Sequence, residues 1–175
     1  KNARIVNVFT QSVEEGDIAI EEGCIVGIGT YDGVMESDLK GAYVCPGFLD
    51  GHIHIESSMT SPREFERAVV PHGTTAVITD PHEITNVAGE AGIRFMMQSA
   101  KKLNLDVYFM LPSCVPATDL DESGAELLAA DLEPFYIEEK VLGLAEVMNA
   151  YGVTHGDKDC LEKLIQARSL RKAID

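Results

Sequence analysis

The sequence predicts an α/β protein whose parallel sheet follows a small β-rich segment. Up to about Cys45, short β-branched runs are separated by glycine-rich turns, as in a small antiparallel sheet. After Pro46, strand-like apolar runs alternate with stretches of helical periodicity, as in parallel β–α–β units. We therefore divide the chain into a segment of residues 1–45 and an α/β segment of residues 46–175.

Composition and charge narrow the class of protein. Hydrophobic residues make up 45% of the 175 residues and charged residues 25%, which is typical of a folded globular chain. The formal net charge of −15 gives a surface that repels phosphate backbones and anionic lipid headgroups. No apolar run reaches the ~18 residues that span a bilayer. We expect a cytoplasmic protein that binds small molecules and neither nucleic acid nor membrane.

The four cysteines are far apart in the sequence and include no C-x-x-C pair. This spacing disfavours both a disulfide framework and a structural zinc site. We expect Cys24, Cys45, Cys114 and Cys160 to be reduced and mostly buried.

The first segment contains four strand candidates. They are the runs "ARIVNVF", "DIAIEEG", "CIVGIG" and "GAYVCPG". Because the chain begins almost inside the first of these runs, we expect further sequence upstream.

The second segment opens with a strand and a helix. "FLDGHIH" is the strand candidate, and "SPREFERAVVPHG" follows it with the signals of a helix. Ser61 and Glu64 have the spacing of a capping box. Pro62 suits the first helical position, and Gly73 suits the C-terminal stop.

Three more strand candidates follow, and each precedes a helix. The strands are "TTAVITDP", "LDVYFMLPS" and "VLGLAEVM". The helix after the first of them has an apolar face at helical spacing, formed by Ile93, Met96, Met97, Ala100 and Leu103.

The two later helices have signals of their own. Ser123 and Glu126 repeat the capping-box spacing ahead of "LLAADLEPF". The last helix of the chain places Leu161, Leu164 and Ile165 on one face.

Four parallel strands alternating with helices allow two closures, an open doubly wound sheet or a (β/α)8 barrel. A barrel needs ~250 residues, and residues 46–175 supply about half of that length. If the sheet belongs to a barrel, only its first half is therefore present.

Asp50, His52 and His54 alternate along the first strand of the α/β segment, so their side chains share a face at its C-terminal end. Parallel α/β folds place their active sites at that end. Two imidazoles about 7 Å apart along a strand, at ~3.3 Å per residue, can converge on one metal ion. An H-x-H pair alone is equally consistent with two partly exposed histidines.

The residues around this pair carry a family resemblance. "PGFLDGHIH" is similar to the metal-binding signature of the amidohydrolase superfamily, and "PGFLDGHIHIESSMTSPREF", "HGTTAVITDPHEITNV" and "GLAEVMN" together resemble one branch of it, the bacterial adenine deaminases. Three separated motifs in the right order, over nearly all 175 residues, make the resemblance specific. It implies the first half of a (β/α)8 TIM-like metallo-hydrolase barrel, preceded by part of a small β-sandwich that both chain ends build.

The resemblance implies that His52 and His54 bind the first metal. It also implies that Glu146 is a catalytic residue that bridges two metals, at the position where many members of the superfamily carry a carboxylated lysine. A carboxylate can bridge two hard cations without any lysine modification. An acidic side chain inside the apolar run "VLGLAEVM" also needs a strong partner if it is buried.

Five further polar residues are candidates for binding substrate. Three follow the second strand of the α/β segment and two follow the histidine pair directly. They could hydrogen-bond a purine or support a metal ligand, or they could only cap their loops. These residues are Glu56, Ser57, Asp80, His82 and Glu83.

The other histidines, His72 and His155, are predicted to be structural. His54 and Glu56 also form the H-x-E pattern of the zinc cytidine deaminases. The chain lacks the P-C-x-x-C that accompanies that pattern, so we set this class aside.

The resemblance implies hydrolytic deamination of adenine to hypoxanthine and ammonia, in purine salvage, by a homo-oligomer with a binuclear divalent metal centre. Manganese is favoured, and iron and zinc are the alternatives. The remaining metal ligands of the superfamily would follow Asp175. We therefore expect the 175 residues alone to be inactive and the full-length parent to be the enzyme.

Two other functions are open on the sequence alone. One is a different amidohydrolase, such as a cyclic amidase or a deacetylase, against which "HIESS" and Glu146 argue. The other is a non-catalytic scaffold that has kept the fold and lost the metals. The intact His52, His54 and Glu146 argue against a scaffold.

Overall fold

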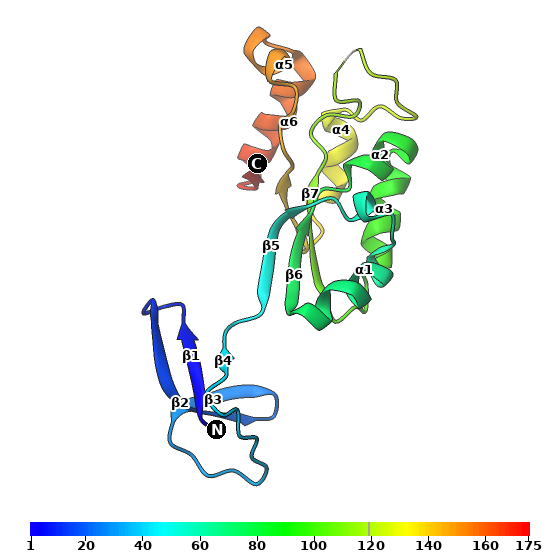
Figure 1. Ribbon diagram of the computed structural model, residues 1–175. Coiled ribbons are helices and arrows are strands. Elements are labelled where there is room, and N and C mark those ends of the chain that lie inside the picture. The colour runs from blue at the N-terminus through cyan, green and yellow to red at the C-terminus, as the bar shows by residue number, and fades with distance from the viewer. Residues whose placement is uncertain (119) are drawn as a thin grey trace. The chain divides into compact units, whose positions relative to one another are not determined.

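A computed structural model describes residues 1–118 and 120–175 (Figure 1). The chain forms two units, Lys1–Gly47 and Phe48–Asp175, each with its own sheet. No helix among the described residues has the length and the apolar composition needed to cross a bilayer.

The first unit is one four-stranded sheet in the order β3-β2-β1-β4. β1 and β2 pair antiparallel, as do β2 and β3, but β1 and β4 pair parallel. The prediction of a wholly antiparallel sheet is therefore wrong for the last pair. The described residues of this unit form one layer, so the β-sandwich stays a prediction. The strands are β1 Ala3–Asn7, β2 Ser12–Glu21, β3 Cys24–Gly29 and β4 Tyr43–Val44.

The second unit is a five-stranded parallel sheet in the order β5-β6-β7-β8-β9. The strands follow one another in chain order without a reversal, which excludes the doubly wound closure. The sheet curls, and this is consistent with the first half of a (β/α)8 barrel. Its strands are β5 Phe48–Ile53, β6 Thr74–Thr79, β7 Asp106–Leu111, β8 Val141–Leu144 and β9 Ala173–Ile174.

The connection from β5 to β6 is helical, as predicted. Two 3-10 turns, η1 Ile55–Ser58 and η2 Val70–His72, flank helix α1 Pro62–Val69. Pro62 starts α1, but Ser61 makes no side-chain cap, so the predicted capping box is wrong. Gly73 ends the connection with a φ of 97°, a left-handed conformation that favours glycine.

Two helices connect β6 to β7, where the sequence predicted one. Helix α2 His82–Ala88 precedes the predicted helix α3 Glu90–Ser99, and Figure 1 shows both beside β6 and β7. Ile93 and Met96 of α3 are fully buried in the core. The other residues of the predicted apolar face, Met97, Ala100 and Leu103, pack against the core and are partly exposed.

The connection from β7 to β8 is mostly irregular and contains helix α4 Ala129–Leu132 and the turn η3 Glu133–Phe135. The predicted Ser123–Glu126 capping box is wrong. The Asp131 carboxylate caps α4 instead, because it accepts a hydrogen bond from the Leu128 N–H at 2.8 Å. The Ser123 hydroxyl donates to the Asn86 carbonyl at 2.8 Å.

Helices α5 Ala150–His155 and α6 Lys158–Ser169 connect β8 to β9. The predicted apolar face of α6 is wrong, because Leu161 and Ile165 are exposed and only Leu164 packs on the core. The buried side chains of this helix are Cys160, Lys163 and Ala167.

The four cysteines are free, as expected, but only two are buried. Cys114 and Cys160 lie inside the second unit, whereas Cys24 and Cys45 of the first unit are exposed.

One hydrophobic core fills the space between the sheet of the second unit and its helices. β7 supplies the centre of this core through Val107, Phe109 and Leu111, which alternate along the strand and are at most 2% exposed. In contrast, five of the six residues of β5 are exposed. The side chains at the C-terminal end of β5 therefore belong to an accessible surface.

Candidate metal centre

Two histidines of the β5 end and a glutamate beyond β8 bring three donor atoms together. His52 Nε2 lies 3.2 Å from His54 Nε2. Glu146 Oε1 lies 3.3 Å from His54 Nε2 and 3.7 Å from His52 Nε2. We call these three atoms the donor triangle. Donors bound at ~2.1 Å to one tetrahedral metal ion lie about 3.4 Å apart, so these residues could hold a metal ion.

The curl of the parallel sheet makes this convergence possible. β5 and β8 are three strand spacings apart, which would be about 14 Å in a flat sheet at ~4.8 Å per spacing. The side chains nevertheless meet, because the curl turns the C-terminal ends of both strands toward one point. His52 lies within β5, His54 directly follows it, and Glu146 lies two residues beyond the end of β8.

Each histidine has a carboxylate beside its other ring nitrogen. His52 Nδ1 lies 2.6 Å from Asp175 Oδ2, and His54 Nδ1 lies 3.2 Å from Glu83 Oε2. The second pair has the distance of an ion pair but not the alignment of a hydrogen bond. A carboxylate accepts protons only, so the hydrogen bond to Asp175 assigns the proton of a neutral His52 ring to Nδ1, and the nearby charge of Glu83 favours the same tautomer for His54.

This assignment tests whether the site fits a metal. With the protons on Nδ1, both Nε2 atoms present lone pairs to each other and to a carboxylate oxygen. Three lone pairs in mutual contact repel unless a cation or a shared proton lies between them. Two neutral imidazoles and a carboxylate are ordinary ligands of a divalent metal, and carboxylates that hold such histidines through their second nitrogen are typical of metal sites. The residues present fit a divalent metal ion.

Asp80 adds an independent observation. It follows β6 and is 2% exposed, and neither of its carboxylate oxygens has a hydrogen-bond partner in the described part of the chain. Burial, together with the charges of Glu146, Glu83, Glu56 and Asp175, raises the pKa of Asp80 to about 8. A group of carboxylates this dense is neutralised either by protons or by cations. A divalent ion at the donor triangle would therefore offset part of this negative charge.

The loops after β5 and β6 are tied together by two glutamates. The Ser57 hydroxyl donates to Glu83 Oε1 at 2.8 Å, while the other oxygen of Glu83 faces His54. Glu56 Oε1 accepts a hydrogen bond from the Ile84 N–H at 3.3 Å, and its Oε2 is buried without a partner among the described residues. Burial raises the pKa of Glu56.

His82 begins α2, and Asn86 one turn later holds its ring. Asn86 Nδ2 lies 2.8 Å from His82 Nε2. An amide NH2 donates, so the proton of the ring lies on Nδ1, which is buried and has no partner in the described part of the chain. Burial lowers the pKa of His82, so the ring is neutral near pH 7.

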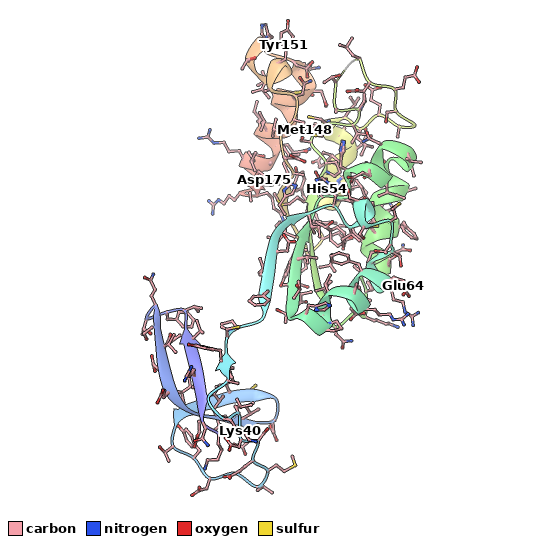
Figure 2. The ribbon with its side chains drawn as sticks, viewed as in Figure 1. Lys40, His54, Glu64, Met148, Tyr151 and Asp175 are labelled. Atoms are coloured by element: carbon pink, nitrogen blue, oxygen red, sulfur yellow. The ribbon has the colours of Figure 1, made fainter. Side chains whose placement is uncertain are left out.

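The structure places all eight predicted site residues at the C-terminal ends of β5, β6 and β8, and Figure 2 marks His54 and Asp175 at this end of the sheet. Ser58, next to the predicted Ser57, instead closes its own turn, because its hydroxyl donates to the Ile55 carbonyl at 2.6 Å. The roles of the eight residues stay predictions.

Sequence reasoning missed three residues that touch this group. Asp175 holds His52, Asn86 holds His82, and Ser113 donates a hydrogen bond to the Glu146 carbonyl. The only sequence signal for Asp175 is its place after the fifth strand, whose C-terminal end points to the same rim. The other two contacts depend on tertiary proximity and leave no pattern along the chain.

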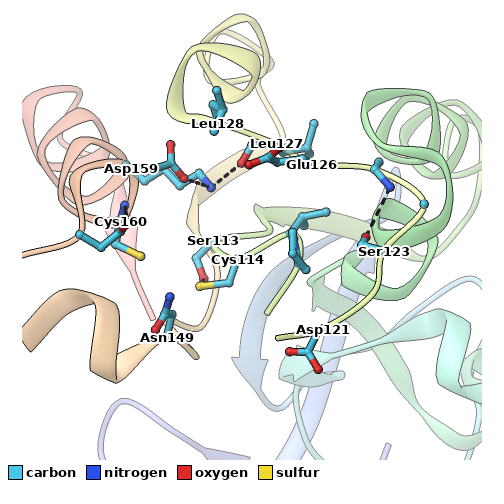
Figure 3. Close-up of a pocket in the computed structure, with 16 residues that line it drawn as sticks. Ser113, Cys114, Asp121, Ser123, Glu126, Leu127, Leu128, Asn149, Asp159 and Cys160 are labelled. Carbon is cyan, nitrogen blue, oxygen red and sulfur yellow. Dashed lines mark hydrogen bonds and ion pairs between the residues drawn. The ribbon is translucent and has the colours of Figure 1, made fainter. Parts of the chain in front are cut away.

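A cavity of about 590 Å3 adjoins the centre on the side of α5 and α6 (Figure 3). Ser113 and Cys114, which follow β7, form part of its wall, and Asn149 and Cys160 face them. Ser113 lines this cavity and also contacts the backbone of Glu146. Ser113 therefore links the wall of the cavity to the backbone of Glu146, one of the three residues of the donor triangle.

Comparison with known proteins found a matching family model and similar sequences. Residues 43–174 match the model of the amidohydrolase family. The chain is 56% identical to an adenine deaminase of Bacillus pumilus and 55% identical to one of Geobacillus kaustophilus, in both cases over 175 residues. An adenine deaminase of Listeria monocytogenes is 50% identical over 176 residues. The alignments cover 100% of this chain and 30% of each relative, so the chain spans about a third of their length.

Proposed function

This chain belongs to the amidohydrolase family, and from that premise we propose that the full-length protein is a metal-dependent adenine deaminase. The reaction is the hydrolysis of adenine to hypoxanthine and ammonia, as the names of the relatives suggest. The observation that carries the proposal is the donor triangle of His52, His54 and Glu146. We further propose a binuclear centre that favours manganese, a homo-oligomer, and a cytoplasmic role in purine salvage.

The two histidines and the glutamate would contribute to metal binding in different ways. A bound divalent ion supplies Lewis acidity, which lowers the pKa of water and provides a nucleophile at neutral pH. His52 and His54 would hold the ion through Nε2, because Asp175 and Glu83 lie beside the opposite ring nitrogens. Glu146 adds negative charge and has a second oxygen with which it can bridge to a neighbouring ion.

Polar atoms without partners are available for the substrate. The buried Nδ1–H of His82 can donate to an acceptor nitrogen of the purine ring. Asp80 and Glu56 offer buried oxygens that can accept from its N–H groups. Each of these atoms loses solvation in the fold, and a hydrogen bond to adenine would restore it. Ser57 and Glu83 support this surface through their mutual hydrogen bond.

Proton transfer needs a group that is beside the metal but not bound to it. Water that attacks C6 releases a proton, and the departing amino group needs one to leave as ammonia. Among the described residues, Glu83 touches the metal-binding His54, and Asp80 lies in the same cluster of charges. We propose that one of these two carboxylates carries the proton.

The test is ammonia release by the full-length protein loaded with Mn2+. Adenine, adenosine and dihydroorotate are compared as substrates, beside a His52→Ala, His54→Ala double variant. His72→Ala is the matched control, because His72 is exposed and lies before β6 rather than after a strand. We expect release from adenine alone, lost in the double variant and kept in the control. No release from adenine by the wild-type protein would contradict the substrate, and release by the double variant would contradict the site.

We also propose that the 175 residues alone do not turn over adenine. The described part of the chain offers one donor triangle, which leaves coordination positions of a binuclear centre unfilled. Adenine turnover by the isolated polypeptide would contradict this part of the proposal.

A further inference from the structure

Ser113 contacts the metal-binding segment without supplying a ligand. It lies two residues beyond the end of β7 and is 3% exposed. Its hydroxyl donates a short hydrogen bond to the main-chain carbonyl of Glu146. β7 and β8 are neighbours in the sheet, so this side chain extends the contact between the two strands past the point where their ladder ends.

The backbone on either side of Glu146 is fixed by other bonds. The Ala145 N–H donates to the Leu111 carbonyl at 2.8 Å, on the side of β7. The Val147 N–H donates to the Asp175 carbonyl at 3.3 Å, on the side of β9. The backbone around Glu146 is therefore hydrogen-bonded on both sides, toward β7 and toward β9, just beyond the end of β8.

The carbonyl of Glu146 itself has two donors. One is the Met148 N–H at 3.1 Å, which belongs to the same local turn. The other is Ser113, the described side chain that ties this carbonyl to another strand. The hydrogen bond from Ser113 restrains the peptide plane that joins Glu146 to Val147, and this plane adjoins the Cα atom from which the Glu146 side chain leaves the chain. The hydroxyl of Ser113 is thus in a position to aim the carboxylate.

The Ser113 hydroxyl has no proton left for another acceptor. A serine hydroxyl carries one proton, and the geometry commits it to Glu146. Its other polar neighbour is the thiol of Cys114, whose Sγ lies 3.2 Å from Ser113 Oγ. In this arrangement the Ser113 hydroxyl therefore does not donate a hydrogen bond to substrate.

We propose that Ser113 is a positioning residue that aims the Glu146 carboxylate at the metal. The inference rests on the proposed metal-dependent function and adds a residue to it. Groups that orient metal ligands from behind typically contribute about 10- to 100-fold to metal affinity or activity. Loss of the hydroxyl should act on metal binding and on the rate of the chemical step, and less on the binding of adenine.

The experiment compares Ser113→Thr with Ser113→Val in the full-length protein. Threonine and valine have nearly the same shape, but only threonine keeps the hydroxyl. Any steric cost of the larger side chain is therefore common to both variants. Ser169→Ala is the matched control, because the Ser169 hydroxyl also donates to a main-chain carbonyl, that of Gln166, at an exposed position of α6. Mn2+ affinity is measured by electron paramagnetic resonance of the free ion, and the visible absorption of the Co2+-loaded protein reports the ligand geometry. Thermal unfolding of the metal-free proteins measures the structural cost separately.

We expect Ser113→Val to bind Mn2+ about 10- to 100-fold more weakly than Ser113→Thr, with an altered Co2+ spectrum and a lower kcat at similar KM. Ser169→Ala should match the wild type. Equal Mn2+ affinity and equal spectra for the threonine and valine variants would overturn the positioning role while leaving the metal site intact. Failure of the wild-type protein to bind Mn2+ would instead overturn the proposed function, and this inference with it.

Discussion

At the scale of single residues, the site depends on which nitrogen of each histidine carries its proton. Asp175 lies 2.6 Å from His52 Nδ1, and Glu83 lies 3.2 Å from His54 Nδ1, so both Nε2 atoms are free to bind a cation. Without these carboxylates either tautomer would form, and the rings would lose the contacts that orient them. We therefore expect the two carboxylates to belong to the proposed metal site, although neither is in the donor triangle.

Replacing Asp175 should weaken metal binding. In Asp175→Ala the His52 ring loses the partner that fixes its proton and its rotation, so we expect Mn2+ affinity to fall about 10- to 100-fold. Equilibrium dialysis of the full-length variant measures this. Asp32→Ala, at an exposed aspartate of the first unit, should leave the affinity unchanged. An affinity equal to that of the wild type would show that Asp175 does not orient His52.

Tyr136, which lies away from the site, should make the stability of the native state depend on pH. Its hydroxyl is buried and has no partner among the described residues, and burial raises its pKa to about 12. The unfolded tyrosine ionises near ~10. Because the folded pKa lies above the unfolded one, the stability of the native state is complete below about pH 10 and falls as pH rises from 10 to 12.

Tyr136→Phe should remove this loss. Urea unfolding at pH 9 and pH 11 should show the wild type losing about 1 kcal/mol more than the variant between the two conditions. Tyr43→Phe, at an exposed tyrosine, serves as the control. The same loss in Tyr136→Phe as in the wild type would mean that this hydroxyl is not the group responsible.

At the scale of elements, an ion pair between the buried Lys163 and the partly exposed Asp159 fastens the long β7–α4 connection to α6. Lys163 Nζ lies 2.6 Å from Asp159 Oδ2 and donates to the Leu127 carbonyl at 2.5 Å. Asp159 Oδ1 also accepts from the Ala129 N–H at 2.8 Å. The segment that walls the cavity beside the metal centre is thus held at its C-terminal end by two side chains of one helix (Figure 3).

Lys163→Met should destabilise the protein by about 1–3 kcal/mol, because it leaves the Leu127 carbonyl buried without its partner and Asp159 without its counter-ion. Lys158→Met is a matched control on the same helix, since Lys158 forms an exposed i,i+4 pair with Glu162. That pair should contribute less than about 0.5 kcal/mol. Both values come from chemical denaturation, and equal losses in the two variants would contradict the clamp.

Strands and long helices could be predicted because their apolar periodicity is local. The four α/β strands and helices α1, α3 and α6 appear where the sequence indicates them. The short helices α2 and α5 were missed because six or seven residues hold too few turns for a periodic pattern. The buried face of α6 could not be predicted, because it contains Lys163, a residue type that is seldom buried, and only its tertiary partners explain its burial.

The candidate site was also predictable only where its residues belong to local sequence motifs. His52, His54 and Glu146 belong to motifs that can be read along the chain, and the structure brings their donor atoms together. Asp175 and Ser113 contact them from other strands, and this proximity arises only when the sheet forms. Side chains that orient ligands are in general chosen by the fold rather than by spacing in the sequence.

At the scale of the whole molecule, the parallel sheet of the second unit brings residues that are far apart in the sequence to one site. All five strands of the second unit run in the same direction, so each delivers the residues at its C-terminal end to one rim. The histidines come from the first strand, Asp80 from the second, Ser113 from the third, Glu146 from the fourth and Asp175 from the fifth. Residues that are far apart in the sequence therefore lie at one rim because the strands share this direction.

The central claim is that this rim binds a divalent metal through the donor triangle. The most direct measurement is an anomalous scattering map at the manganese absorption edge, from crystals of the full-length protein grown with Mn2+. We predict a peak about 2.1 Å from His52 Nε2, His54 Nε2 and Glu146 Oε1. A map with no peak between these three atoms would contradict this claim, whether manganese is bound elsewhere in the crystals or not at all.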